Sequence, residues 1–432
     1  SCREQAIQAL TSDAGDTYTV WNPSSWPFTG LVALEDQDTD MGTPWIQAEG
    51  QVLQSEFDGT TVWVRVENVP PLGFVTIQRK KEVQADHVAA VTSEPFKVRP
   101  NGIETPIYRI EWNDRGQLIS IFDRVAGREV LASGERGNVL QVFEDKPKMF
   151  EAWDIDVFYQ EKQREVEQLQ ECKVDTGSLR AVVHFTWTYM SSTIRQQMIL
   201  YADNRRIDFR TWVDWQERQQ LLKVAFPVDI RATEATYDIQ YGNVKRPTHW
   251  NTSWDFARFE TVGHQWVDLS ERGYGVSLLN DCKYGHDIKD HVIRLSLLKS
   301  ATYPDPQADR GEHEFTYALY PHEGYWSEGG TVQAAALLNQ PVYATPGAVP
   351  ASSFSLLQTS GSVDVVIDAV KKAEDDDSVI VRFHEYKGGR GRVRLHVGVP
   401  VMSWQETDLM ERPAGELSSA DAIELTVTPY EI

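Results

Sequence analysis

Residues 144–156, EDKPKMFEAWDID, place an aromatic side chain among carboxylates. Trp153 stands beside Asp154, and Asp156 follows two residues later. A flat apolar ring against one face of a sugar, with acids that bind its hydroxyl groups, is the chemistry of a carbohydrate site. In a β-strand, whose side chains alternate between faces, Asp154 and Asp156 would share one face and Trp153 would lie on the other. The segment is therefore a candidate sugar-binding surface.

The spacing of these two carboxylates does not suit bond cleavage. A retaining glycosidase holds its two carboxyl groups about 5 Å apart on opposite sides of one bond. Two same-face positions of a strand lie about 6–7 Å apart and point in parallel, so Asp154 and Asp156 would be a poor acid–nucleophile pair. A second interpretation stays open, in which a strand leaves a proline turn with its acids in water, because charged residues on exposed strand faces are ordinary.

Two further segments are dense in aromatic and ionisable residues. RPTHWNTSWDFARFE, residues 246–260, either lines a site or forms a structured loop, and its stacking and hydrogen-bonding residues are His249, Trp250, Trp254 and Arg258. GYGVSLLNDCKYGHD, residues 273–287, reads as a strand followed by polar residues, where Gly285 permits a bend. The polar side chains that emerge there are Asp281, Lys283 and Tyr284.

Histidine and aspartate residues at the end of the third segment raise the question of a metal site. They are His286, Asp287, Asp290 and His291. Their spacing matches no compact ligand pattern of a helix or strand, and exposed mixtures of these residues are frequent, so we expect no metal site. The sequence also has no GxSxG elbow, P-loop, HExxH motif or dinucleotide-binding glycine fingerprint.

The composition is that of a folded protein with an acidic surface. The 432 residues are 41% hydrophobic and 11% aromatic, and they include 14 Trp and 16 Tyr, which combine stacking surface with a polar group. A net charge of −22 disfavours nucleic acid and membrane partners but leaves neutral sugars open. Three distant cysteines give no disulfide framework and no Cys-rich zinc site. No membrane-length apolar run and no signal-peptide pattern are present, so we expect a cytoplasmic protein.

Short β-type runs broken by Pro, Gly and Asn fill the chain after residue 10 and indicate an all-β fold of several antiparallel β-sandwiches. The clearest run, RRIDFRTWVDW at 205–215, predicts a long strand with one buried face. Residues 1–10 have helical character, and convincing helices are almost absent beyond them. The predicted domain bounds are 1–10 for the helical segment, 11–98 for a small sandwich, 99–345 for a large sandwich and 346–432 for a C-terminal sandwich.

Several long motifs carry a resemblance to a known family. They are TVWNPSSWPFTG at 19–30, FEDKPKMFEAWDID at 143–156, RPTHWNTSWDFARFE at 246–260, WVDLSERGYGVSLLNDCKYGHD at 266–287, RLSLLKSATYPDPQADRGEHEFTYALYPHEG at 294–324 and VKKAEDDDSVIVRFHEY at 370–386. In this order, and over nearly the whole chain, they resemble the C-terminal half of the α-mannosidases of glycoside hydrolase family 38. The likeness is greatest to the bacterial and cytosolic branch of that family.

The resemblance implies a chemistry for an intact enzyme. Family members are zinc-dependent retaining enzymes that release terminal α-linked mannose from oligosaccharides. Their Asp nucleophile, Asp acid/base and zinc ligands lie on an N-terminal α/β barrel and the adjoining helical bundle, and none of those motifs can be placed in this sequence. The resemblance thus implies a fragment without catalytic residues or a bound cofactor of its own. Residues 1–10 would be the end of the bundle, and the large central sandwich would be of the galactose mutarotase type.

We expect the aromatic–acid segments to border the sugar site of such an enzyme. The rim candidates are Trp153, Asp154, Asp156, Asp281, Lys283 and Tyr284. The implied partners are an α-mannosyl oligosaccharide and the N-terminal barrel and bundle, and homo-oligomer formation stays open. The alternative is a free-standing carbohydrate-binding or structural β-sandwich protein, because large sandwiches of this kind also occur in lyases and sugar epimerases.

Overall fold

The computed structural model describes residues 2–12, 15–34, 43–47, 50–80, 94–419 and 422–432. Strands dominate these residues and form antiparallel sheets, which confirms the all-β class predicted from the sequence. None of the helices in these ranges has the length and apolar character that crossing a membrane requires.

The chain forms two compact units. Unit 1 comprises Ser1–Ala90, Gln240–Asn243 and Gln340–Ile432, and unit 2 comprises Val91–Ile239 and Val244–Asn339. The sandwich bounds given by the sequence stay predictions.

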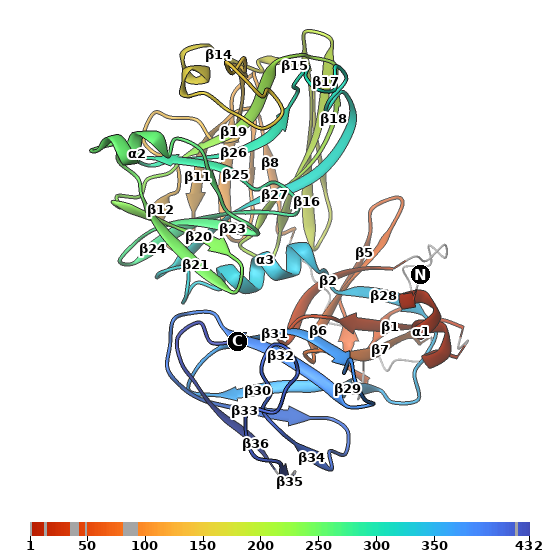
Figure 1. Ribbon diagram of the computed structural model, residues 1–432. Coiled ribbons are helices and arrows are strands. Elements are labelled where there is room, and N and C mark those ends of the chain that lie inside the picture. Colours follow the sequence, from red (N-terminus) through yellow and green to blue (C-terminus); the bar gives the residue numbers. More distant parts are fainter. Residues whose placement is uncertain (1, 13–14, 35–42, 48–49, 81–93, 420–421) are drawn as a thin grey trace. The chain divides into compact units, whose positions relative to one another are not determined.

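Unit 2 contains three antiparallel sheets, and Figure 1 shows its long neighbouring strands β15 to β18 as one continuous layer. The nine-stranded sheet has the order β15 (Gln168–Thr176), β16 (Arg180–Tyr189), β17 (Ser192–Tyr201), β18 (Ile207–Trp215), β27 (Gly311–Glu323), β24 (Tyr274–Asn280), β23 (Trp266–Glu271), β20 (Glu234–Ile239) and β21 (Gly242–Pro247). The six-stranded sheet has the order β14 (Gln163–Glu165), β13 (Val139–Glu144), β19 (Gln220–Pro227), β26 (Val292–Lys299), β25 (Gly285–Lys289) and β22 (Thr261–Val262). The five-stranded sheet has the order β12 (Arg128–Glu129), β11 (Leu118–Asp123), β10 (Tyr108–Trp112), β9 (Gly102–Glu104) and β8 (Lys97–Arg99).

Strand β18 shows the alternation that its sequence predicts. Its buried side chains Ile207, Phe209, Val213 and Trp215 belong to the main core, whereas Arg210 and Asp214 are exposed. The prediction of one buried face is thus confirmed. The physical cause is the two-residue period of a strand, which turns every second side chain toward the opposing sheet.

One continuous apolar core joins the three sheets of unit 2. Phe209 of the nine-stranded sheet stacks on Tyr317 with ring centroids 5.2 Å apart, and it meets Phe226 of the six-stranded sheet at 5.7 Å. Burial of each such ring stabilises the fold by about 1.5–3 kcal/mol. This core holds the six-stranded sheet rigidly in place.

Strand β19 differs from β18, because nearly all of its residues are buried on both faces. The inner face packs on the main core, and the outer face is covered by a small apolar cluster of Phe143, Tyr159 and Leu221, against which Ile155 and Phe259 pack. Tyr159 lies on the short 3-10 helix η3 (Val157–Glu161). Segments outside the sheet therefore close its outer face.

Three α-helices lie in the described residues. The predicted helical character of the first ten residues is confirmed by α1 (Cys2–Leu10), which has no buried side chain. Sequence reasoning missed α2 (Ser253–Ala257), which Thr252 and Asp255 cap reciprocally, and α3 (Thr331–Asn339), which packs on β24. The signal for α3 was available, because an Ala- and Leu-rich run of good helix formers follows two glycines.

Unit 1 consists of smaller antiparallel sheets. Its largest sheet has the order β28 (Tyr343–Pro346), β1 (Thr17–Asn22), β7 (Gly73–Arg79), β3 (Trp45–Ile46) and β4 (Val52–Leu53), with β29 (Ser353–Ser355) also paired to β7. The two three-stranded sheets are β2 (Phe28–Leu34), β6 (Val62–Val69) and β5 (Ser55–Phe57), and β30 (Leu357–Gly361), β33 (Gly391–Val397) and β36 (Ile423–Val427). The two-stranded sheets pair β31 (Val365–Lys372) with β32 (Val379–Glu385), and β34 (Ser403–Trp404) with β35 (Ser418–Ser419).

Candidate functional site

The segment EAWDID, 151–156, is a turn and not a strand. The carbonyl of Phe150 accepts hydrogen bonds from the backbone N–H groups of Trp153 at 2.8 Å and Asp154 at 2.9 Å, and Phe150 itself has a φ of +56°. The alternating faces considered from the sequence therefore do not apply, and that interpretation was wrong. The turn leaves the Trp153 side chain 68% exposed, edge-on to the Phe150 ring.

Two carboxylates hold this turn in place, one through a local bond and one through a bond to a distant segment. Asp156 Oδ2 accepts a hydrogen bond from the backbone N–H of Lys148 at 2.9 Å. Glu151 Oε2 accepts from the backbone N–H and the hydroxyl of Thr302, both at 2.8 Å, and these bonds hold the pKa of Glu151 below its usual value. Asp154 is exposed. Of the two aspartates singled out in the sequence, Asp156 is thus engaged in the turn itself.

The loop between β24 and β25 carries the other three predicted rim residues. Asp281 Oδ2 accepts from the backbone N–H of Thr316 at 2.9 Å, and the Lys283 ammonium lies 4.7 Å above the centre of the Phe315 ring. Tyr284 is 53% exposed and is the one of the three with a large free surface. No hydrogen bond, ion pair or ring contact in the described residues joins this loop to the turn at 151–156, so the structure does not bring the two predicted sets into direct contact.

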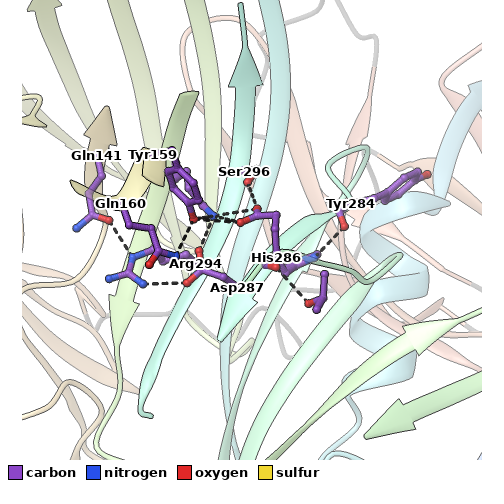
Figure 2. Close-up of polar contacts among 11 residues, drawn as sticks. Gln141, Tyr159, Gln160, Tyr284, His286, Asp287, Arg294 and Ser296 are labelled. Atoms are coloured by element: carbon purple, nitrogen blue, oxygen red, sulfur yellow. Dashed lines mark hydrogen bonds and ion pairs between the residues drawn. The ribbon is translucent and has the colours of Figure 1, made fainter. Parts of the chain in front are cut away.

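A buried ion-pair network lies on the outer face of the six-stranded sheet, and Figure 2 shows part of it. We call it the Lys223 network, and its charged members are Lys223, Glu260, Asp287 and Arg294. Lys223 lies opposite Gln141 of β13 and Ser296 of β26 in the strand register, so these three side chains belong to one face of the sheet. Its side chain is fully buried.

The Lys223 ammonium has acceptors on three separate segments. It donates to Glu260 at 2.7 and 2.9 Å, to Asp287, and to the Tyr159 hydroxyl at 3.3 Å. Asp287 Oδ1 also accepts from Arg294 Nη1 at 2.9 Å. Tyr159 and Ser296 in turn donate to the Glu260 carboxylate, at 3.2 and 2.6 Å. Two cations and two carboxylates therefore neutralise one another inside the protein.

The electrostatics of the network do not favour acid–base chemistry. Burial by itself would lower the pKa of Lys223, but Asp287 and Glu260 outweigh burial and hold the ammonium protonated. Burial would likewise raise the pKa of Asp287, and the charges of Lys223 and Arg294 hold it below its ordinary value. A retaining glycosidase needs two carboxyl groups that face a substrate across a gap. Glu260 and Asp287 instead share one ammonium, so the network is a structural element.

The network connects to both predicted rim segments through the chain. Tyr159 on η3 follows the turn at 151–156, and Asp287 on β25 follows the loop that contains Tyr284. The adjacent His286 binds the carbonyl oxygen of Tyr284 through Nδ1 at 3.2 Å, and Figure 2 shows the Tyr284 ring directed away from the network. The buried charges thus position the bases of two surface segments.

Residues 246–260 run along the same side of unit 2 and end at Glu260 of the network. Trp250 packs edge-on to Phe256 with ring centroids 5.4 Å apart, and the Lys289 ammonium lies 4.0 Å above the Trp250 ring. Trp254 on α2 is 75% exposed. The sequence had left open whether this segment lines a site or forms a structured loop, and it contains a capped helix with exposed and half-buried aromatics.

Sequence reasoning missed the principal members of this network. Lys223, Glu260 and Arg294 were not candidates, although a lysine within LLKVAFPV was a visible anomaly in an apolar run.

Among the described residues, no group of three His, Cys, Asp or Glu side chains could hold a metal ion. Asp287 is taken by two cations, and His291 contacts Glu135 at 2.8 Å. The described residues therefore do not fit a zinc site.

Comparison with known proteins identifies the family. Residues 103–307 match the glycosyl hydrolases family 38 C-terminal domain, and residues 364–432 match the glycosyl hydrolases family 38 C-terminal beta sandwich domain. Together the two matches cover more than half of the chain. The chain belongs to glycosyl hydrolase family 38. The resemblance seen in the sequence motifs is thereby confirmed.

Relatives within family 38 are longer than this chain. It is 40% identical over 405 residues to Alpha-mannosidase 2C1 of Homo sapiens, covering 90% of this chain and 38% of that protein. It is also 40% identical to Alpha-mannosidase G of Dictyostelium discoideum, covering 85% of this chain and 35% of that protein. An α-mannosidase structure from Enterococcus faecalis V583 shares the fold at a TM-score of 0.77 and 16% identity, over all of this chain and 57% of that one.

Replacing Lys223 with Met tests the structural role of the network. We expect the free energy of unfolding of unit 2 to fall by about 3–5 kcal/mol, because Asp287 and Glu260 would stay buried without their ammonium. Lys162→Met is the matched control, since its side chain is 70% exposed and pairs with Glu144 at 2.9 Å, and it should cost less than about 1 kcal/mol. Urea unfolding followed by tryptophan fluorescence measures both. Equal losses in the two variants would refute the buried role.

His286 makes the stability of unit 2 depend on pH. Burial lowers the pKa of His286 to about 3, whereas an unfolded histidine titrates near 6.5. Between pH 6.5 and about pH 3 only the unfolded state binds the proton. The free energy of unfolding therefore decreases as the pH is lowered, by as much as about 1.4 kcal/mol per pH unit. His286→Met should reduce this slope between pH 6.5 and 5 in urea titrations.

The control for this experiment is His291→Met, whose side chain is 37% exposed. This variant controls for the loss of a histidine as such, because the His291 ring is not buried, and a change of slope as large as in His286→Met would contradict the role of burial. An unaltered slope in His286→Met would show that His286 accepts its proton without unfolding of its surroundings.

Proposed function

We propose that this chain is the β-sheet portion of a zinc-dependent retaining α-mannosidase that hydrolyses terminal α-linked mannose from oligosaccharides. The observation that carries the proposal is membership of family 38, together with relatives named α-mannosidases of which this chain spans little more than a third. The nucleophile, the acid/base and the zinc ligands then belong to a barrel and helical bundle outside this chain.

The geometry of unit 2 supports a scaffolding role for this portion. Two carboxylates near the candidate segments, Glu260 and Asp287, are paired with cations in the Lys223 network, and Asp145 of the segment 144–156 is buried and paired with Lys299. In contrast, Trp153 and Tyr284 are more than half exposed at the ends of segments that the network anchors. Exposed aromatic rings on a rigid base suit contact with a sugar or with a neighbouring domain.

The rim proposal therefore keeps the six residues named from the sequence but assigns them different parts. Trp153, Asp154 and Tyr284 present exposed groups, whereas Asp156 bonds within its own segment and Asp281 and Lys283 contact strand β27. We further propose a cytoplasmic enzyme, in keeping with the resemblance of the sequence motifs to the bacterial and cytosolic branch of the family. The partners would be an α-mannosyl oligosaccharide and the catalytic domains.

Substitutions in a polypeptide that joins this chain to the catalytic part test the rim. We expect Trp153→Ala to lower kcat/KM for an α-mannoside about tenfold, because a lost stacking contact is worth on the order of 1 kcal/mol or more. Trp212→Ala is the matched control, since Trp212 lies on the outer face of the nine-stranded sheet under Arg210 and should leave kcat/KM unchanged. Wild-type kinetics for Trp153→Ala and for Asp154→Asn would show that neither residue borders the sugar site.

The separated chain provides a second test. We expect the 432-residue protein to release no aryl alcohol from an aryl α-mannoside, with or without added zinc, because its buried carboxylates are already paired. Calorimetric titration with mannose should give no binding or only weak binding. Hydrolysis by this chain alone would place the chemistry here, and tight mannose binding would favour a free-standing carbohydrate-binding protein.

A further inference from the structure

An open pocket adjoins the Lys223 network on the outer side of unit 2. Residues of β21, β25 and the helix α2 region surround it, and Asp287 lies at the boundary between the pocket and the network. Its walls are partly aromatic and apolar, and they include Tyr237 and Trp250. A small polar ligand would thus meet groups that are partly shielded from water.

Three cations line this pocket, and they are Arg246, Arg258 and Lys289. The Arg246 guanidinium lies 4.4 Å above the centre of the Tyr237 ring, and its buried Nη1 has no hydrogen-bond partner in the described part of the chain. Lys289 is placed over the Trp250 ring. None of the three forms an ion pair with a carboxylate among the described residues.

The carboxylates in the pocket do not neutralise these cations. Asp287 already forms ion pairs with Lys223 and Arg294, and the charges of the Lys223 network sum to zero. Asp255 caps α2, where its Oδ2 accepts from the backbone N–H and the hydroxyl of Thr252 at 3.1 and 2.9 Å. Even with the Asp255 charge counted in full, the pocket keeps an excess of positive charge.

This excess is unusual in a protein of net charge −22. Burial lowers the pKa of Arg246, and the nearby charge of Arg258 lowers it further, so the two guanidinium groups repel each other in the absence of an anion. An anion bound near both guanidinium groups would relieve that repulsion and accept their hydrogen bonds. The acidic surroundings would repel nucleic acids and other large polyanions, which leaves small anions as the ligand class.

We propose that this pocket binds a small phosphate-type oxyanion, supplied as inorganic phosphate or as the phosphate group of a sugar ester. The planar guanidinium groups of Arg246 and Arg258 donate to its oxygens, and Lys289 contributes a third positive charge. The proposal is independent of the mannosidase assignment, because every group that it uses belongs to this chain.

Calorimetric titration of the 432-residue chain with sodium phosphate, at ionic strength held constant with sodium chloride, tests the proposal. We expect saturable binding that weakens about tenfold or more in Arg246→Gln and in Arg258→Gln, because each variant loses a charged hydrogen-bond donor. Lys245→Gln removes the same charge from a neighbouring side chain that is 64% exposed, and it should bind phosphate as the wild type does.

Arg258 is exposed at the end of α2, so Arg258→Gln keeps the test valid even if Arg246→Gln impairs folding. A parallel titration with a hexose 6-phosphate separates the two sources of the ligand. Tighter binding of the ester assigns the pocket to a sugar phosphate, and equal binding assigns it to inorganic phosphate. The proposal fails if phosphate gives no saturable heat above the chloride control, or if Lys245→Gln weakens binding as much as the pocket variants do.

Discussion

The burial of one ammonium group organises the outer side of unit 2. Lys223 occupies a strand whose two faces are both covered, so its charge cannot reach water and must find acceptors within the protein. Asp287 comes from β25, two strands away in the same sheet, whereas Glu260 and Tyr159 come from segments that flank the sheet strands in sequence. An uncompensated buried charge would cost several kcal/mol, and this cost gives the covering segments a fixed position.

Two kinds of surface lie beside this network, and they differ in charge. The turn near Trp153 and the loop at Tyr284 present aromatic rings and acids, as a neutral sugar or a domain partner would require. The pocket beside Asp287 presents Arg246 and Arg258, neither of which pairs with a carboxylate of the residues that the structure describes. Because Asp287 is held by Lys223 and Arg294, its negative charge is not available to that pocket. The ion pairs inside the sheet thus determine the charge that a ligand meets outside it.

Family membership and the internal geometry of unit 2 both favour a supporting role for this chain in a larger enzyme. The chain spans little more than a third of the length of two α-mannosidase relatives, and inside unit 2 the carboxylates of the Lys223 network are paired with cations. Glu151 illustrates the point, because a residue next to the candidate sugar platform uses both carboxylate oxygens to hold the turn in place. Positioning of exposed groups by neighbours whose hydrogen bonds are all made within the protein is the property that a supporting domain needs.

The sequence by itself determined the all-β class, the buried face of β18 and the family. Strand periodicity and long motifs can both be read from consecutive residues, without knowledge of distant contacts. It did not determine the turn at Trp153 or the Lys223 network. The turn depends on Glu151 binding Thr302, and the network joins Tyr159, Lys223 and Asp287, pairs of residues that lie 64 positions apart. A lysine in an apolar run signals an anomaly, but only the fold can show which distant carboxylates neutralise it, since such contacts are set by the strand order of the sheet and by the segments that cover it.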